Sequence, residues 1–287
     1  MSAQACCIWP VEASLGEGPV WDSTGQCLWF VDIRQGLLHR CASDGTGRKS
    51  WFLGGQPSFV LPTTTGGLVL GNRHELLHWR DGDSALLARV AMRNEDRFND
   101  ATVDPMGRIW FGSMDDGEAI CSGMVRVFDR GTIEEAGGPA VITNGPAISP
   151  DGRWLYHVDT LERIIWRFDI SGAARLENGV PFAIIAPADG WPDGVTIDAE
   201  DHVWVGLWGG WAARRYAPDG SHVCTVRFPC ANITKLAFGG PDLRTAFVTT
   251  ARSGIDPDRL EDQPLAGGLF AFEAPAPGCP LPQVHLA

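Results

Sequence analysis

The sequence predicts an all-β fold, a six-bladed β-propeller. One pattern recurs six times along the 287 residues: a polar or small residue, a short apolar run, a turn rich in Asp and Gly, and a returning aromatic-rich run. Each copy is typical of a β-hairpin. The copies begin roughly 40 to 50 residues apart, which is the span of one four-stranded blade. The content of 35 Gly and 20 Pro also suits many short strands joined by tight turns.

The best-preserved copy spans residues 192–205, where Val-Thr-Ile leads through an Asp-Ala-Glu-Asp turn into Val-Trp-Val. The other five copies open at Glu17, Pro57, Asn99, Asn144 and Thr234. Because the copies extend into the C-terminal region, they leave no room for a second fold. We therefore expect residues 1–287 to form one propeller domain.

Residues 4–10 form a strand-like segment ahead of the first copy. In a propeller such a strand usually pairs into the last blade, which closes the ring and removes an exposed strand edge. We then expect the first blade over residues 17–53, with outer strands at 37–39 and 50–52, and the second blade up to about Val90.

Within the second blade, residues 74–78 (His-Glu-Leu-Leu-His) match the H-E-x-x-H pattern of zinc peptidases. That chemistry requires a helix, in which residues four apart share a face and can bind one ion. Residues 76–78 align instead with the Leu-Leu-His strand at 37–39, and in a strand residues four apart lie roughly 13 Å apart. We therefore predict a strand with two surface or edge histidines.

Two longer connections are candidates for the rim of the central channel. The third blade opens at Phe98 and carries an acidic, Gly-containing insertion at residues 115–122, which forms either solvated surface or a wall of a pocket. A long connection over residues 176–191 precedes the fifth blade. Residues 267–272 form the last clear strand, and we expect the Pro-rich tail after Glu273 to lie on the surface.

The charge balance argues against nucleic acid as a partner. The formal net charge is −12, and no stripe of Lys and Arg is present to bind a phosphate backbone. No stretch has the length of a membrane-spanning helix, and the N-terminus lacks the regions of a secretion signal. We expect a cytoplasmic monomer without a membrane partner. The eight Cys lack zinc-ribbon spacing and are expected to be buried free thiols.

The register of the repeats brings polar side chains together. The innermost strand of each blade lines the channel, so equivalent residues of the copies lie at similar height and point toward one axis. We align the copies on an apolar position, which is Trp21 in the first copy and Ile197 in the fifth, and step back four residues. The residues there are Glu17, Pro57, Asn99, Asn144, Asp193 and Thr234.

Two carboxylates, two amides and a hydroxyl are thus expected in one small volume. Short polar residues also begin strands for purely local reasons. Glu17, however, is a poor turn residue and stands between two glycines that let the backbone pass close to a ligand. An uncompensated carboxylate pair near the axis would be costly. We therefore expect one divalent metal ion with oxygen ligands, which suits Ca²⁺, Mg²⁺ or Mn²⁺ and also permits Zn²⁺ or Fe²⁺.

With these residues the chain resembles the senescence-marker-protein/gluconolactonase family, which includes regucalcin and bacterial aldonolactonases. The resemblance covers nearly the whole chain. Its motifs are residues 16–21 (Gly-Glu-Gly-Pro-Val-Trp), 97–100 (Arg-Phe-Asn-Asp), 104–108 (Asp-Pro-Met-Gly-Arg), 143–145 (Thr-Asn-Gly) and 192–195 (Pro-Asp-Gly-Val). Residues 142–146, 157–162 and 207–210 resemble the bacterial pentonolactonases more than the animal proteins. The whole pattern resembles bacterial aldonolactonases, of the xylono-, arabinono- and gluconolactonase type.

The resemblance implies roles for particular residues. Glu17, Asn144 and Asp193 fall on the family's metal ligands, and Arg97 and Asn99 fall on its substrate-binding pair. An acidic substrate contact follows the second strand of the third blade, where either of two carboxylates fits, because this loop differs from the vertebrate one. The two carboxylates are Asp116 and Glu118.

The predicted function is hydrolysis of a pentono- or hexonolactone to its aldonic acid, in bacterial sugar oxidation. The chain contains no G-x-S-x-G elbow, so the expected reaction is metal-assisted attack of water on the ester carbonyl. Asp193 is the expected catalytic residue, either as general base or as a ligand only. Two alternatives remain open: a non-catalytic calcium-binding or scaffold propeller, and a propeller esterase or phosphotriesterase.

Overall fold

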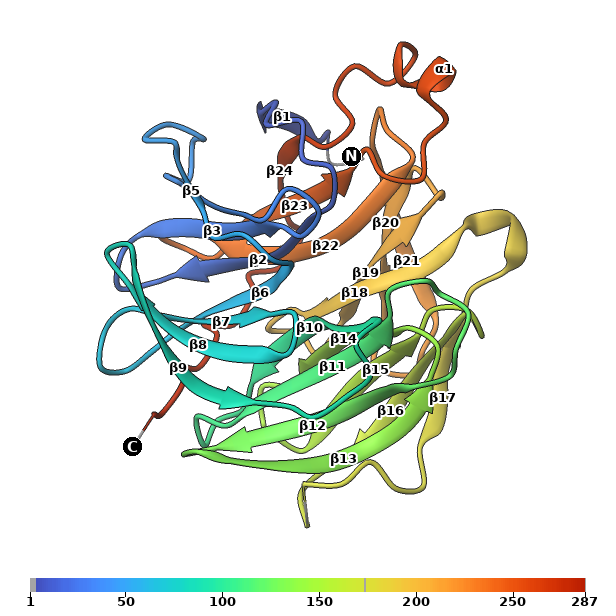
Figure 1. The fold of residues 1–287 in the computed structure, drawn as a ribbon. Helices are drawn as coiled ribbons and strands as arrows, with labels where there is room; N and C mark the ends of the chain where they lie inside the picture. Colours follow the sequence, from blue (N-terminus) through green and yellow to red (C-terminus); the bar gives the residue numbers. More distant parts are fainter. Residues whose placement is uncertain (1–3, 173, 287) are drawn as a thin grey trace.

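The computed structural model describes residues 4–172 and 174–286. Over these residues, strands form six four-stranded antiparallel sheets around a central channel (Figure 1). Their innermost strands contact one another in a closed ring, in the order β2, β6, β10, β14, β18, β22. This arrangement confirms the six-bladed β-propeller.

The blades follow one another along the chain, and in the first five the strands are added from the channel outward. The first blade has β2 (Gly16–Asp22), β3 (Cys27–Asp32), β4 (Leu37–Cys41) and β5 (Lys49–Phe52). The second has β6 (Pro57–Pro62), β7 (Leu68–Asn72), β8 (Glu75–Arg80) and β9 (Asp83–Arg89). The third has β10 (Asp96–Val103), β11 (Ile109–Asp115), β12 (Gly123–Asp129) and β13 (Thr132–Ala140).

The remaining blades follow the same order, with one exception in the last. The fourth has β14 (Thr143–Ile148), β15 (Trp154–Asp159), β16 (Ile164–Asp169) and β17 (Val180–Ile184). The fifth has β18 (Trp191–Ile197), β19 (Val203–Trp208), β20 (Ala212–Tyr216) and β21 (His222–Arg227). The sixth has β22 (Asn232–Gly239), β23 (Thr245–Ala251), β24 (Leu269–Glu273) and β1 (Cys6–Trp9). Two short helices, η1 (Pro187–Asp189) and α1 (Pro257–Leu260), lie in connections.

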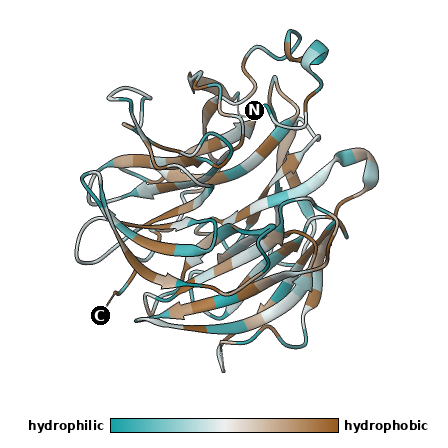
Figure 2. Cartoon of the chain, in the orientation of Figure 1, coloured by the Kyte–Doolittle hydropathy of each residue, from teal (hydrophilic) through white to brown (hydrophobic). Residues whose placement is uncertain are grey.

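Burial falls from the channel outward. The innermost strands β6, β10 and β22 are buried along their whole length, whereas the outermost strands β5 and β9 are largely exposed. Figure 2 shows that the most hydrophobic residues lie mainly in the strands of the blades, whereas α1 and many of the loops are hydrophilic. The blades pack face to face through large rings such as Trp110 and Trp204, which are fully buried. This packing removes apolar surface from water and gives the channel rigid walls.

Two buried carboxylates explain the Asp that recurs in the turns of the repeat. Asp104 accepts hydrogen bonds from two backbone N–H groups of its turn and, at 3.0 Å, from the indole of Trp110. Asp198 does the same in the fifth blade, where the Trp204 indole donates at 2.9 Å. Each carboxylate therefore ties a turn to the strand that follows it. These turns lie where the innermost strands end, which we call the far end of the channel.

The expected closure of the ring is confirmed. The strand β1 pairs antiparallel with β24, and the sixth sheet has the order β1-β24-β23-β22. The N-terminal strand thus completes the blade that the C-terminal region begins. The pairing covers an edge that would otherwise stay open.

The H-E-x-x-H segment is a strand, as predicted. Residues 75–78 belong to β8, and His74 directly precedes it; the two histidines make separate contacts with backbone carbonyls. His74 Nε2 lies 2.7 Å from the Asp96 carbonyl oxygen, and His78 Nε2 lies 3.0 Å from that of Gly66. The segment therefore supplies no zinc site.

Two expectations about the outer parts of the blades are wrong. Residues 176–191 are not a plain connection, because they contain the outermost strand of the fourth blade, β17, and the turn η1. A proline and half-exposed neighbours hide that strand's pattern. The eight Cys are free, but only Cys27, Cys41 and Cys230 are buried, since others lie on outer strands and loops.

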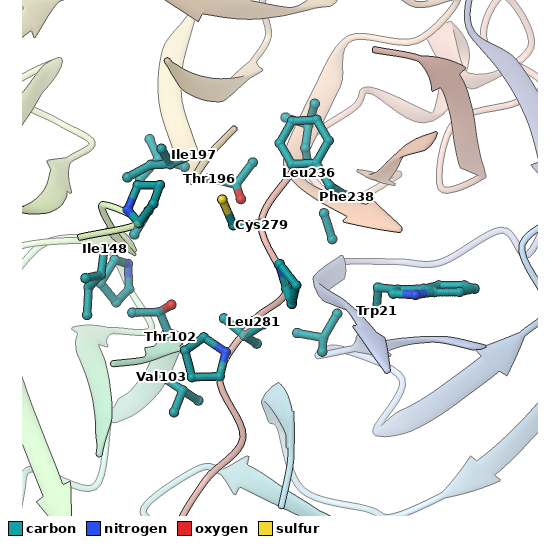
Figure 3. Close-up of a pocket in the computed structure, with 18 of the residues that line it drawn as sticks. Trp21, Thr102, Val103, Ile148, Thr196, Ile197, Leu236, Phe238, Cys279 and Leu281 are labelled. Atoms are coloured by element: carbon teal, nitrogen blue, oxygen red, sulfur yellow. The ribbon is translucent and has the colours of Figure 1, made fainter. Parts of the chain in front are cut away.

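The C-terminal tail does not lie on the outer surface, contrary to the prediction. It crosses the far end of the channel, where Gly278 bridges Asp198 and Val284 bridges Thr63. A cavity of about 350 Å³ lies at this end, and Leu281 of the tail lines it together with inner-strand residues (Figure 3). A Pro-rich segment has no strand periodicity, so its burial leaves no pattern in the sequence.

Among the described residues, no helix has the length and apolar character needed to cross a membrane.

We predict that the tail contributes to stability through Val284, which is fully buried against apolar side chains of the second and third blades. Val284→Asp should lower the free energy of unfolding by about 3 kcal/mol or more, because it buries an unpaired charge. Val223→Asp, at a position that is 47% exposed, is the control and should change it by less than about 0.5 kcal/mol. If denaturant titrations show equally small changes in the free energy of unfolding for the two variants, the tail does not stabilise the far end of the channel.

Candidate functional site

A register shift interrupts every innermost strand near the position that the repeat alignment singled out. In the described sheets the shifts lie between Glu17 and Val20, Pro57 and Phe59, Phe98 and Ala101, Asn144 and Pro146, Pro192 and Val195, and Ile233 and Leu236. Such bulges bend a strand and re-aim its side chains. Here they turn polar side chains into the channel at the end where the innermost strands begin.

Four of the six aligned residues line one cavity of about 460 Å³, namely Glu17, Asn99, Asn144 and Asp193. The hydroxyl of Thr234 does not join them, which corrects the prediction. It is fully buried and donates instead to the Gly16 carbonyl oxygen at 2.6 Å. A buried hydroxyl needs a hydrogen-bond partner, and the backbone carbonyl of Gly16 lies within reach of this short side chain.

The predicted metal ligands lie close together and are almost completely buried. Asn144 Nδ2 donates a hydrogen bond to Asp193 Oδ1. The backbone N–H of Gly18 donates to Glu17 Oε2 at 2.7 Å, and that of Gly145 donates to Asn144 Oδ1 at 3.0 Å. Both glycines have positive φ, so they orient these N–H groups at little conformational cost.

The electrostatics of this trio are unfavourable for two anions. Burial raises the pKa of Glu17 well above its ordinary value, and the negative charges of Asp193 and Asp100 add to the effect. Burial also raises the pKa of Asp193, again with a contribution from Asp100. The positive charge around both carboxylates is therefore too small to offset the cost of burying their ionised forms.

A divalent cation fits this donor set. Two carboxylates and an amide are hard oxygen donors, which suit such an ion, and its charge would offset the unfavourable burial. Rotation of the Asn144 amide by half a turn would present its oxygen beside Asp193. Within the described residues no group of three or more His, Cys, Asp and Glu is placed to hold a metal, so a site here would use the Asn144 amide as its third side-chain ligand.

Arg97 is fixed next to the trio by side chains of its own strand and of the insertion. Its Nη1 donates to Asn99 Oδ1 at 2.7 Å, and its Nε donates to Asp116 Oδ1 at 2.6 Å. Asn99 Nδ2 in turn donates to the Thr143 carbonyl oxygen at 2.9 Å. The two predicted substrate-binding residues therefore form one connected unit on β10.

The structure separates the two carboxylates that the sequence left as alternatives. Asp116 is held by Arg97, by Arg34 at 2.7 Å and by Gln56 at 3.0 Å. Burial alone would raise the pKa of Asp116, but these partners outweigh it and lower the pKa to about 2. Glu118 is exposed and lines the cavity instead. Asp116 thus holds Arg97, and Glu118 faces the space that a ligand would occupy.

The cavity also has an aromatic wall and a pair of buried charges below it; of these residues only Trp191 belongs to a connection predicted as a rim. Trp191 and Trp208 are cross-strand partners that line the cavity, and the Arg163 guanidinium lies 4.2 Å from the centroid of the Trp191 ring. The motif at residues 157–162 and the Gly-Gly at 209–210 lie beside this wall but gave no sign of it. Beneath the trio, Lys235 pairs with Asp100 at 2.6 Å.

The family model described as SMP-30/Gluconolactonase/LRE-like region matches residues 15–252. The chain belongs to this family. The match confirms the resemblance inferred from the motifs, and it includes all the predicted metal-binding and substrate-binding residues. The segments β1 and β24 that close the ring, and the tail, lie outside the matched residues.

Relatives in the SMP-30/gluconolactonase family align along most of their length. The 6-deoxy-6-sulfogluconolactonase of Pseudomonas putida is 30% identical over 287 residues, which cover 96% of this chain and 97% of that protein. The L-arabinolactonase of Azospirillum brasilense is 32% identical over 279 residues, covering 95% and 92%. A calcium-binding protein, regucalcin, from Agrobacterium tumefaciens superposes with a TM-score of 0.92 at 26% identity, covering 100% and 98%.

We predict that Asp116 stabilises the fold through Arg97. Asp116→Asn should lower the free energy of unfolding by about 1–2 kcal/mol near neutral pH, because a buried guanidinium loses its counter-ion. Because the folded pKa of Asp116 is lowered to about 2, this contribution is present above the unfolded value of about 3.9 and is lost as the pH falls toward 2. The difference between wild type and variant should therefore shrink over that range.

Denaturant titrations at several pH values measure this difference. Glu118→Gln is the matched control in the same loop and should leave neutral-pH stability within about 0.5 kcal/mol of wild type. Equal losses for the two variants would contradict the separate roles of these carboxylates.

Proposed function

We propose that this chain is a metal-dependent sugar lactonase that opens a pentono- or hexonolactone to its aldonic acid. The observation that carries the proposal is the buried trio of Glu17, Asn144 and Asp193 in the same cavity as Arg97 and Asn99. The two relatives named as lactonases support the reaction class.

In this proposal Glu17, Asn144 and Asp193 hold one divalent ion. When bound, the cation polarises the ester carbonyl of the substrate and stabilises the negative charge that develops on its oxygen. Strands β2, β14 and β18 supply these residues from three different blades, and binding of the ion would require only rotation of the Asn144 amide. Ca²⁺, Mn²⁺, Mg²⁺, Zn²⁺ and Fe²⁺ all accept such oxygen donors.

Arg97 and Asn99 orient the substrate. Hydrogen bonds within the described residues occupy Nε and Nη1 of Arg97, which leaves Nη2 available to a sugar hydroxyl or ring oxygen. Asn99 retains one amide hydrogen after its bond to Thr143. Because both side chains are already fixed, little conformational entropy is lost when they bind.

Glu118 and Trp191 are assigned to the outer part of the same pocket. Glu118 lines the cavity and can accept hydrogen bonds from substrate hydroxyls. Trp191 offers an apolar face to the C–H side of a sugar ring, with Arg163 holding the indole in place. This combination of polar floor and aromatic wall suits a polyhydroxylated ring.

In this mechanism Asp193 accepts the proton of the attacking water and returns it to the ring oxygen, which becomes a hydroxyl when the acyl C–O bond breaks. Its carboxylate lies in the cavity beside Asn144, close to where the ester carbonyl would be held. A carboxylate that also binds a cation is a weaker base, so its two roles compete. The alternative is that Asp193 serves as a ligand only.

We predict metal-dependent acid release from aldonolactones. After chelation and dialysis, ring opening of xylono-, arabinono- and gluconolactone should fall to the spontaneous rate in a pH-stat, and one of the five ions should restore it. Asp193→Ala should abolish tight metal retention in elemental analysis. A protein that binds an ion but accelerates no lactone would favour a non-catalytic calcium-binding propeller. A preference for aryl esters or phosphotriesters would favour the esterase alternative.

A second prediction separates the two roles of Asp193. Asp193→Asn keeps an oxygen donor but cannot accept the proton, so kcat should fall by about 10²-fold or more with metal still bound. Asp219→Asn, in an exposed turn of the fifth blade, is the control and should keep the wild-type kcat. Near wild-type kcat in Asp193→Asn, with metal retained, would show that Asp193 is a ligand only.

A further inference from the structure

Lys235 is one of only two lysines in the chain, and it is buried in the channel. Its Nζ lies 2.6 Å from Asp100 Oδ1 and 2.7 Å from Asp100 Oδ2. A third contact reaches the Ala101 carbonyl oxygen at 3.4 Å. The ammonium of Lys235 is thus bound by residues of another blade.

The ion pair spans the axis of the propeller. Asp100 lies on β10 and Lys235 on β22, and in the ring of innermost strands β10 and β22 are three steps apart in both directions. The third and sixth blades therefore face each other across the channel, and this pair connects them.

The pair also forms the floor of the candidate site. Asn99 lines the cavity that holds the trio, whereas Ala101 and Lys235 line the cavity at the far end. Asp100 stands between Asn99 and Ala101 in the chain. The Lys235–Asp100 pair therefore lies between the two cavities.

Lys235 passes directly against the backbone next to a predicted metal ligand. A Cβ on Gly194, the neighbour of Asp193, would approach Lys235 Cγ to 2.6 Å. Only glycine leaves room for the lysine stem at this point. The ammonium and the trio therefore belong to one small, buried volume in which charges interact strongly.

Three carboxylates share this volume with one ammonium. Glu17 and Asp193 line the cavity, Asp100 lies in its floor, and the Lys235 ammonium binds both oxygens of Asp100. Because Lys235 neutralises Asp100, the two negative charges of Glu17 and Asp193 balance the two positive charges of one divalent cation. Without Lys235, a third negative charge would remain.

We propose that the Lys235–Asp100 pair sets the charge of the axial site, with Lys235 as an internal counter-cation that leaves Glu17 and Asp193 to hold one divalent ion. This inference rests on the proposed metal-dependent function. Lys235 is a positioning residue in this scheme, because it acts through Asp100 and does not contact the substrate.

The test is the affinity for Ca²⁺ of metal-free protein, measured by calorimetric titration. Lys235→Met keeps the length of the stem and leaves Asp100 unneutralised, so Ca²⁺ should bind about tenfold more tightly or better. Asp100→Asn leaves the ammonium unpaired beside the trio, so Ca²⁺ should bind about tenfold more weakly or worse. The double variant D100N/K235M should return to within about threefold of wild type, because the two charge effects cancel.

The opposite signs distinguish charge setting from a merely structural role. Either single variant leaves a buried charge unpaired and should lower the unfolding temperature of the metal-free protein. Arg215→Met is the matched control, because it breaks the buried Arg215–Asp198 pair at 2.8 Å in the fifth blade, outside the cavity of the trio. It should lower stability without changing the affinity for Ca²⁺.

Equal Ca²⁺ affinities in wild type, both single variants and the double variant would overturn the inference while leaving the metal site intact. If Lys235→Met fails to fold, the Ca²⁺ affinity of Asp100→Asn is compared with that of the double variant. Equal affinities in these two proteins would also overturn the inference. A wild-type protein that binds none of the five divalent ions would overturn the proposed metal site itself.

Discussion

The register shift in each innermost strand is the constraint on which the site depends. In a regular strand, successive side chains point to opposite faces of the sheet, and here both faces pack against neighbouring blades, so a regular strand would direct few side chains at the axis. The bulge on β10 removes that limit. Asn99 can then line the cavity while the next residue, Asp100, pairs across the channel. One irregularity thus supplies both the polar wall and the charged floor.

The apolar packing between blades makes this polar centre sustainable. Around the channel, fully buried side chains such as Phe98, Phe111 and Trp204 fill the spaces between neighbouring sheets. The centre, in contrast, contains two carboxylates whose ionised forms burial disfavours. Sites of this kind are kept at a cost in stability that the rest of a fold must offset. Here the six apolar interfaces between neighbouring blades offset that cost together.

Features that recur in every blade could be predicted from the sequence. Contacts that occur only once, between particular blades, could not. The blade count, the ring closure by residues 4–10 and the strand at residues 74–78 follow from periodicity and are confirmed. The meeting of Glu17, Asn144 and Asp193 in one cavity follows from the same alignment, and their roles stay predictions. The pairing of Lys235 with Asp100 could not be found, because it links opposite blades that no local pattern relates. Thr234 had the right register but a nearer hydrogen-bond acceptor.

The pairing of β1 with β24 has a consequence for how the protein folds. Strand β1 can pair only when β24 is in place, and closing so long a loop between two strands far apart in the chain is entropically slow. Until then, the sheets on either side of the missing sixth blade keep open edges. Those neighbours are the first and fifth blades, which carry Glu17 and Asp193. Glu17 and Asp193 are therefore held at a fixed separation only after the sixth blade has closed the ring.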